Sequence, residues 1–336
     1  MSELNKIALK IISKSKGILA ADESNGTMTK RLEAVNVKST PENRLSFREI
    51  LFSSDGMKDY IGGVILYDET INQISSTGKS IPNLISSSGA VPGIKVDTGA
   101  KDLANSPKEK VTEGLDGLRD RLKKYYDLGA RFTKWRGVYS IGENYPSKLA
   151  ISSNAHALAR YSALVQENGM VPIVEPEVLM DGNHSAEVCF NKTSEVIKKC
   201  FEELILHKVD LSGIILKPNM ILSGNLSENK ISSEEVSIKT LECLKNCVPN
   251  EVPGIAFLSG GQSEIEATEN LNLINKNNNT NFIMTYSYGR ALQQSALKVW
   301  SNDIKNVEAA QTTFNHRAKM CTLAAQGKWS SELENK

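Results

Sequence analysis

The chain has 336 residues, of which 40% are hydrophobic and 24% are charged, and its net charge is +1. This composition is typical of globular proteins, and the balanced charge argues against nucleic acid or an anionic membrane as a partner. No apolar run approaches the ~18 residues of a membrane-spanning helix. Because the N-terminus also lacks the pattern of a signal peptide, we expect a cytoplasmic protein.

Eight short apolar runs, many of them β-branched, recur at intervals that fit βα units of about 30 or more residues. They span residues 17–21, 61–67, 91–96, 130–135, 171–175, 213–216, 254–258 and 282–286. Apolar residues between positions 4 and 12 fit one face of a short N-terminal helix. Helical patterns fill the gaps, for example over residues 155–166 and 193–207. Alternating strands and helices predict a parallel sheet.

Eight similar units favour a closed (β/α)8 TIM barrel over an open doubly wound sheet, and no G-x-G-x-x-G motif follows the first strand. No Gly/Ser-rich or Pro-rich linker separates the units. Residues 1–336 are therefore expected to form a single barrel domain, with a short tail from about residue 327. The asparagine-rich segment 270–281 is predicted to be a polar loop before the eighth strand.

Cysteines and histidines form no local metal motif. The five cysteines are interpreted as buried free thiols in a reducing compartment. A redox or metal pair of Cys243 and Cys247, which could share a helix face, is the less favoured interpretation. The four histidines are scattered, and neither H-x-x-x-H nor C-x-x-C spacing occurs. We therefore expect no metal and no other cofactor.

Charged residues stand at the ends of most of the predicted strands, where a barrel has its active site. They include Asp22, Lys95, Asp97, Lys134, Arg136, Glu175, Glu177 and Lys217. Because side chains alternate along a strand, Lys134 and Arg136 share one side, as do Glu175 and Glu177. A structural ion-pair network is the alternative interpretation. Charged residues at so many strand ends on one side of the barrel favour a functional site. Burying a charge costs folding free energy unless the charge is paired or has a function.

These residue types suit Schiff-base chemistry. A desolvated lysine beside other cations becomes a nucleophilic amine that can attack a carbonyl substrate. The iminium product withdraws electrons, so that a nearby C–C bond can break without a metal. Carboxylates such as Asp22, Glu175 and Glu177 are candidates for the proton transfers.

Lys217 is the favoured nucleophile among three candidate lysines. It follows the apolar run Ile-Ile-Leu, and Pro218 disfavours helix at this position and so defines the strand end. Lys134 has an arginine two residues away and suits electrostatic stabilisation better. Lys134 and Lys95 remain alternatives on this reasoning.

The seventh and eighth predicted strands end in small, glycine-rich turns, Ser259-Gly-Gly261 and Ser287-Tyr-Gly-Arg290. Backbone N–H groups in such turns can bind a phosphate, with arginine as the counter-charge. Barrels often bind phosphate at this position, so a phosphate site is predicted here. Asp68 and Glu69, after the second strand, are hard to interpret.

Taken together, these segments resemble those of class I fructose-bisphosphate aldolases. The motifs are GILAADES (17–24), GIKVD (93–97), KWR (134–136), VPIVEPE (171–177), LKPNM (216–220), LSGGQS (258–263) and YSYGRAL (286–292). The resemblance runs from about residue 5 to Trp329. It implies a metal-independent lyase of glycolysis and gluconeogenesis, which reversibly cleaves fructose 1,6-bisphosphate to dihydroxyacetone phosphate and glyceraldehyde 3-phosphate. It also implies a homo-oligomer, because the family is usually tetrameric.

The resemblance implies roles for individual residues. Lys217 resembles the Schiff-base lysine, and Glu175, with Glu177 beside it, is similar to the acid/base of the carbinolamine steps. Asp22 matches the aspartate that orients the lysine and helps to take the C4 hydroxyl proton, and Lys134 matches the lysine near the scissile bond. The C1-phosphate site would comprise Ser259, Gly260, Gly261, Ser287, Gly289 and Arg290. The C6-phosphate side would comprise Ser24, Thr27 and Lys95. Arg31, Arg44 and Arg136 match further substrate-contact arginines of the family.

Some positions depart from the family pattern. Thr27 stands where serine is common, and Ser212 stands where glutamate is common. Many members end in a tyrosine that assists proton exchange on the enamine, whereas no tyrosine follows Tyr288 here. We expect either that Glu177 or water takes over that step or that the step runs more slowly.

Two other functions stay open on sequence grounds. One is a lysine aldolase that prefers another ketose phosphate, such as fructose 1-phosphate or sedoheptulose 1,7-bisphosphate. Contacts from Ser24, Thr27 and Lys95 to the aldehyde end of the substrate would determine which of these substrates is preferred. The other is a scaffold or binding protein on an inactive fold, which should have lost lysine, acid or phosphate-binding residues. None of these residues is lost.

Overall fold

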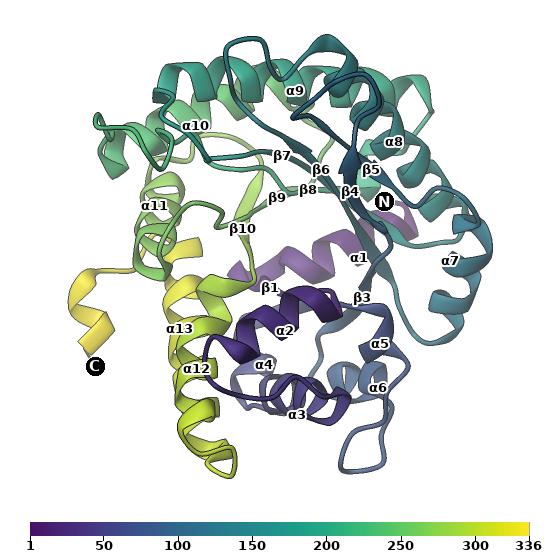
Figure 1. Ribbon diagram of the computed structural model, residues 1–336, viewed down its shortest axis with the longest axis vertical. Helices are drawn as coiled ribbons and strands as arrows, with labels where there is room; N and C mark the ends of the chain where they lie inside the picture. The colour runs from purple at the N-terminus through teal and green to yellow at the C-terminus, as the bar shows by residue number, and fades with distance from the viewer. Residues whose placement is uncertain (336) are drawn as a thin grey trace.

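Eight parallel strands close into a barrel in the order β1-β10-β9-β8-β7-β6-β3-β2 (Figure 1). The computed structural model describes residues 1–335. The strands are β1 (Gly17–Ala21), β2 (Ile61–Leu66), β3 (Val91–Lys95), β6 (Phe132–Tyr139), β7 (Val171–Val178), β8 (Ile215–Leu216), β9 (Gly254–Phe257) and β10 (Ile283–Tyr288). Every apolar run predicted to be a strand contributes to this barrel, and the predicted (β/α)8 fold is confirmed.

Helices surround the strands and connect them in sequence (Figure 1). They are α1 (Glu3–Ile12), α2 (Asn25–Glu33), α3 (Pro41–Phe52), α4 (Gly56–Tyr60), α5 (Asp68–Ile71), α6 (Ile81–Ser87), α7 (Leu118–Asp127), α8 (Lys148–Glu167), α9 (Ala186–Leu206), α10 (Ser233–Cys247), α11 (Glu264–Asn277), α12 (Arg290–Asn302) and α13 (Val307–Ala325). Short 3-10 helices are η1 (Ser13–Ser15), η2 (Leu211–Gly213) and η3 (Ser331–Asn335), and the hairpin β4 (Gly99–Asp102) and β5 (Lys110–Glu113) is antiparallel. Within the described residues, no helix has the length and apolar character needed to cross a bilayer. All five cysteines are free and buried, as predicted.

The strand before Lys217 is shorter than predicted. Gly213 ends the 3-10 helix η2, Ile214 follows it in an extended conformation, and β8 contains only Ile215–Leu216. The cause is local, because the side chain of Asp210 accepts a hydrogen bond from the backbone N–H of Ser212 at 2.9 Å. Such a bond stabilises a turn in competition with the sheet.

The prediction of a polar loop over residues 270–281 is wrong for most of the segment, because α11 extends into it. Leu271 and Ile274 are fully buried on one face of this helix. At its start, Ser263 and Glu266 form a capping box, in which each side chain accepts a hydrogen bond from the other residue's backbone N–H. Burial of the apolar face therefore outweighs the low helix propensity of asparagine.

Helix α1 covers the amino-terminal end of the barrel. Ala8, Ile11 and Ile12 pack in one buried cluster with inward-facing strand residues, namely Ile18, Ala20, Ile65, Val91, Phe132, Val171, Ile173, Ile215 and Ala256. At Gly62, which lies at the start of β2, a Cβ atom would be 1.8 Å from the backbone oxygen of Ile11. The close approach of α1 therefore requires glycine there. This end of the barrel is apolar, which leaves the opposite end for polar residues.

Replacing Ile11 by alanine should destabilise the protein by about 2–5 kcal/mol, because it opens a cavity among fully buried side chains. Urea unfolding measures this difference. Lys10→Ala is the matched control, since Lys10 is exposed on the same helix, and its effect should stay within about 0.5 kcal/mol. Equal effects of the two substitutions would contradict the closing role of α1.

Candidate active site

The barrel opens at the carboxyl ends of its strands into a cavity of about 290 Å³. Six cationic and five anionic side chains line it, namely Arg31, Lys95, Lys134, Arg136, Lys217 and Arg290, and Asp22, Glu23, Asp97, Glu175 and Glu177. This near balance allows many charges to be buried in one place, because each can have an opposite charge nearby.

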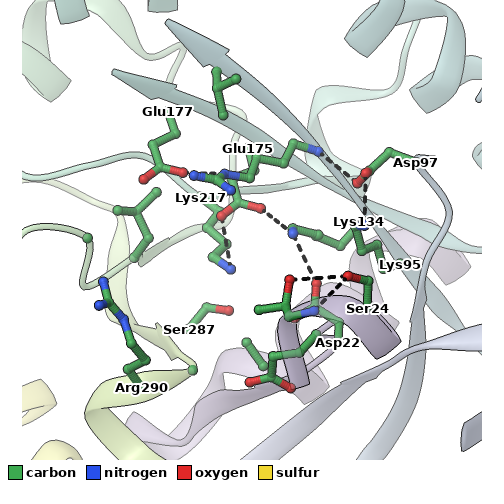
Figure 2. A pocket seen from close by; sticks show the side chains of 18 of the residues that line it. Asp22, Ser24, Lys95, Asp97, Lys134, Glu175, Glu177, Lys217, Ser287 and Arg290 are labelled. Atoms are coloured by element: carbon green, nitrogen blue, oxygen red, sulfur yellow. Dashed lines mark hydrogen bonds and ion pairs between the residues drawn. The ribbon is translucent and has the colours of Figure 1, made fainter. Parts of the chain in front are cut away.

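Glu175 lies at the centre of this group, between two lysines (Figure 2). Its Oε1 is 3.1 Å from Nζ of Lys217, and its Oε2 is 3.0 Å from Nζ of Lys134. Lys134 also donates a hydrogen bond of 3.0 Å to Oδ2 of Asp22. Glu175, Lys134 and Lys217 are each at most 5% exposed. The four side chains thus form a continuous chain of alternating charge.

Strand pairing produces this arrangement. Arg136 of β6 pairs in register with Glu175 of β7, and Val138 pairs with Glu177 one pleat further along. Glu177 forms an ion pair with Arg136. The predicted faces are confirmed, because both residue pairs of β6 and β7 line the cavity. Lys217 lies just beyond β8, where the backbone N–H of Lys217 donates to a β7 carbonyl at 2.8 Å.

Burial and neighbouring charges have opposite effects on these groups. Burial alone would raise the pKa values of Asp22 and Glu175, but the nearby lysines, Lys134 foremost, lower both. For Lys134, burial alone would lower the pKa, but Asp22 and Glu175 raise it. At neutral pH both carboxyls are therefore ionised and Lys134 keeps its proton. This favours an electrostatic role for Lys134 and disfavours it as the nucleophile.

Ser287 and Arg290 lie on one side of the cavity, with Lys95 and Asp97 on the other and Lys217 between them (Figure 2). The Oγ atom of Ser287 is buried and has no hydrogen-bond partner among residues 1–335. Arg290 is exposed and begins α12. Free backbone N–H groups and partial positive charge at a helix start favour an anion. This side can therefore bind a phosphate.

The glycine-rich turn after β9 borders the same side. Ser259 and Gly260 line the cavity, and a Cβ at Gly260 would lie 2.8 Å from Oε1 of Glu177. Gly261 is not part of the lining; it has φ +77°, and a Cβ there would lie 2.6 Å from Cβ of Met180. A side chain at Gly260 would therefore crowd the site, and Gly261 provides the turn.

The opposite side carries hydroxyl groups and a lysine. Ser24 is the N-cap of α2, and its Oγ is 3.1 Å from Oγ1 of Thr27. Nζ of Lys95 is 3.1 Å from Oδ1 of Asp97. Arg31 reaches the cavity from α2, forms an ion pair with Glu23, and lies toward the Ser287 side, because its Nη2 is 3.7 Å from the position of a Cβ at Gly289. This side has the groups needed for a second anion.

The structure does not bring Arg44 to the cavity wall. Its Nε donates to Oε2 of Glu69 at 2.8 Å, and its Nη2 pairs with the other carboxylate oxygen. Hydrogen bonds from Arg44 lower the pKa of Glu69. The charges after β2 that were hard to interpret thus have structural partners, since Asp68 also accepts a hydrogen bond of 2.8 Å from the hydroxyl of Tyr125.

Sequence reasoning missed a buried network behind the cavity. Arg48 donates to the backbone oxygen of Glu23 at 2.7 Å. Gln293 donates to the backbone oxygen of Ala20 at 2.6 Å and to Oε1 of Glu23 at 3.2 Å. The only available signal was Glu23 itself, at the end of the first strand. Arg48 and Gln293 belong to helices, with no sequence pattern that connects them to the site.

Comparisons with known proteins agree with this geometry. The sequence model described as "Glycolytic: Fructose-bisphosphate aldolase class-I" matches residues 3–336. The chain is 48% identical to "Probable fructose-bisphosphate aldolase class 1" of Xanthomonas campestris, over 98% of this chain and 99% of that protein. It is also 48% identical to "Fructose-bisphosphate aldolase 4, cytosolic" of Arabidopsis thaliana, over 99% of this chain and 85% of that one.

A solved structure shows the same likeness in three dimensions. Fructose-bisphosphate aldolase from Plasmodium falciparum, in complex with TRAP and a small-molecule inhibitor, superposes with a TM-score of 0.96 at 44% sequence identity. The superposition covers 98% of this chain and 95% of that one. On the full-length match, the sequence identity and the shared barrel, this chain belongs to the class I fructose-bisphosphate aldolase family.

Proposed function

We propose that this protein reversibly cleaves fructose 1,6-bisphosphate to dihydroxyacetone phosphate and glyceraldehyde 3-phosphate through a Schiff base on Lys217. Family membership supports the reaction. The observation that carries the proposal is the buried amine of Lys217, 3.1 Å from Glu175, between two sides of the cavity that can each bind an anion. A ketose with a phosphate at each end matches that arrangement.

The first half of the reaction forms the iminium. Nζ of Lys217, after it has lost a proton to Glu175, attacks the C2 carbonyl carbon, and a proton moves from this nitrogen to the new alkoxide to give the carbinolamine. The carbinolamine then loses water as Glu175 returns the proton that it took up to the departing hydroxyl. Oε1 of Glu175 lies 3.1 Å from Nζ of Lys217, within reach of these proton transfers, while Oε2 pairs with Nζ of Lys134.

The second half breaks the C3–C4 bond. Its electron pair moves into the iminium to give an enamine, while Asp22 takes the proton of the C4 hydroxyl and the aldehyde leaves. Lys134, which contacts both Asp22 and Glu175 at 3.0 Å, offsets negative charge near that bond. Protonation of the enamine at C3, with Glu177 or water as the donor, and hydrolysis of the new iminium release dihydroxyacetone phosphate.

Binding of the two phosphates is assigned to the two sides of the cavity. The C1-phosphate is proposed to contact Ser259, Gly260, Ser287, Gly289 and Arg290, with Gly261 shaping the turn. The C6-phosphate is proposed to contact Ser24, Thr27 and Lys95, and Arg31 and Arg136 are proposed as further substrate contacts. Arg44 is left out of the proposed contacts because Glu69 already holds its guanidinium.

Assembly and location are also inferred from the family. We propose a homotetramer, and light scattering on the purified protein during size-exclusion chromatography would test this.

We also propose a cytoplasmic location, which the name of the cytosolic Arabidopsis relative supports. Fractionation of the source cells would test it.

Incubation with dihydroxyacetone phosphate followed by borohydride should leave a reduced adduct on Lys217, because borohydride converts the iminium to a stable secondary amine. Peptide mass mapping would locate it. Lys217→Met should keep the fold and form no adduct, with cleavage of fructose 1,6-bisphosphate almost abolished. Lys95→Met is the matched control, since Lys95 lies on the aldehyde side of the proposed site, and should still form the adduct. An unmodified wild-type protein, or activity lost in EDTA, would refute Schiff-base catalysis.

The preferred ketose phosphate can be tested with two cationic residues on opposite sides of the cavity. Lys95→Met should lower kcat/KM for fructose 1,6-bisphosphate about 10- to 100-fold by removing a charged hydrogen bond, and should leave fructose 1-phosphate almost unaffected. Arg290→Gln should lower kcat/KM for both substrates. If Lys95→Met lowered both equally, the assignment of the C6-phosphate side would be wrong.

A further inference from the structure

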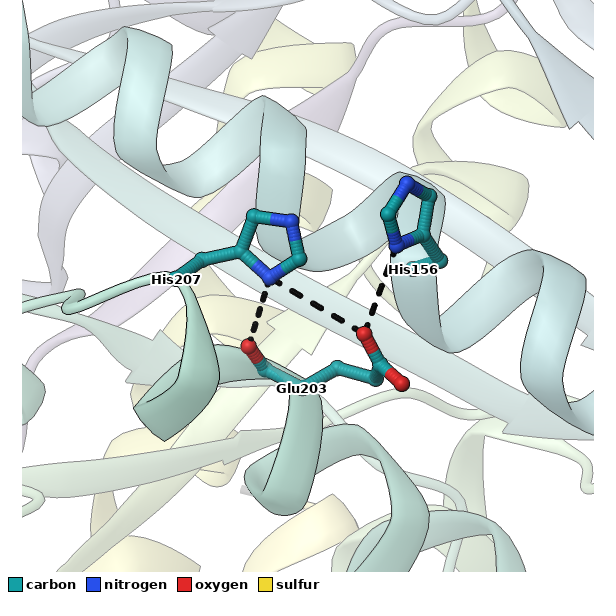
Figure 3. Close-up of side chains that lie close together, drawn as sticks. All are labelled: His156, Glu203 and His207. Atoms are coloured by element: carbon teal, nitrogen blue, oxygen red, sulfur yellow. Dashed lines mark hydrogen bonds and ion pairs between the residues drawn. The ribbon is translucent and has the colours of Figure 1, made fainter.

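Three potential metal ligands meet away from the catalytic cavity, between α8 and α9 (Figure 3). One nitrogen each of His156 and His207 and one oxygen of Glu203 all lie within 4.8 Å of one another. His156 belongs to α8, whereas Glu203 lies in the last turn of α9 and His207 caps that helix. None of the three lines the cavity at the barrel mouth.

Both imidazoles approach the same carboxylate oxygen. Nδ1 of His156 is 3.3 Å from Oε2 of Glu203, and Nδ1 of His207 is 3.9 Å from it. Ligand atoms around a tetrahedral Zn²⁺, with bonds of about 2.0–2.1 Å, lie roughly 3.3 Å apart. The first spacing already fits this geometry, and the second requires a shift of about half an ångström.

Glu203 is held so that one oxygen remains directed at the histidines. It is 9% exposed, and its Oε1 is 3.1 Å from Nζ of Lys199. Burial alone would raise the pKa of Glu203, but hydrogen bonds from Lys199 and His156 lower it. Glu203 is therefore an ionised carboxylate at neutral pH. The side chain of His156 is 51% exposed, which gives an ion from solvent access to the site.

We propose that His156, Glu203 and His207 bind a divalent transition-metal ion of the Zn²⁺ type. Two imidazoles and one carboxylate form a donor set that Zn²⁺, Co²⁺ and Ni²⁺ accept, with water completing the coordination. Without metal, Nδ1 of His207 donates to the backbone oxygen of Glu203 at 2.8 Å. Binding either replaces this hydrogen bond or rotates the ring to present Nε2.

The ion joins two helices that both pack against β7, the strand of Glu175 and Glu177. Its role is therefore structural, and no step at the barrel mouth depends on it. Because the ion binds the folded chain, it should raise the melting temperature, and above the dissociation constant the rise should grow with the logarithm of the ion concentration.

Titration of the purified full-length protein with Co²⁺ tests the site. Isothermal calorimetry should give one ion per chain, and the visible absorption of bound Co²⁺ should report nitrogen and oxygen ligands. His156→Gln, His207→Gln and Glu203→Gln should each weaken binding at least about tenfold. His316→Gln is the matched control, because Nε2 of His316 is 3.5 Å from Oε2 of Glu334 without a second imidazole in that pair, and binding should be unchanged.

Absence of Co²⁺ binding at millimolar concentration, or binding that persists in both His156→Gln and His207→Gln, would overturn the site. Circular dichroism should first show that the variants are folded. Zn²⁺ should raise the melting temperature of the wild-type protein and leave that of His207→Gln unchanged; an equal rise in both would also overturn the proposal. Cleavage of fructose 1,6-bisphosphate should be insensitive to EDTA whether or not the metal site exists. Failure of the metal-binding test is therefore distinguishable from failure of the Schiff-base test.

Discussion

The carboxylate of Glu175 allows two lysines of like charge to be buried together at the barrel mouth. Lys134 and Lys217 contact different oxygens of this group, at 3.0 and 3.1 Å. Removing one partner from such a buried set leaves an uncompensated charge, which costs about 3–5 kcal/mol. Asp22 provides a second negative charge beside the ammonium group of Lys134. The stability of the barrel mouth and its proposed chemistry therefore depend on the same contacts.

Each of these charged residues follows an apolar one on the same face of its strand. The members of each pair are two positions apart, namely Ala20 and Asp22, Phe132 and Lys134, Ile173 and Glu175, and Ile215 and Lys217, and the first member of each pair belongs to the apolar cluster covered by α1. One layer of the barrel interior is thus hydrophobic and the next is charged. In the apolar run before Lys217, Ile215 therefore belongs to this interior layer, whereas Ile214 and Leu216 pack in the other buried cluster.

The sequence predicts what depends on local alternation and misses what depends on contacts between distant segments. Side chains alternate between the two faces of a strand, so the apolar runs predict the strands, and the spacing of the charged residues after them predicts which of these share a face. The barrel and the positions of Lys134 and Glu175 could therefore be expected. The helix over the asparagine-rich segment forms because one face is buried, and Arg44 is turned from the cavity by Glu69. The histidines of the proposed metal site showed no spacing signal, because they lie on different helices that pack together.

The buried network behind the cavity connects the two sides that are proposed to bind the phosphates. Gln293 of α12 binds the backbone of Ala20 and the side chain of Glu23, and Glu23 in turn pairs with Arg31. The segment after β1, which carries Asp22 and Ser24, is thereby fixed to the helix that begins at Arg290. Since that helix borders the proposed C1-phosphate side and the segment borders the proposed C6-phosphate side, these bonds resist a change in the distance between the two sides. Discrimination between ketose phosphates of different length would then depend on a spacing set by buried residues as well as on the groups that touch the phosphates.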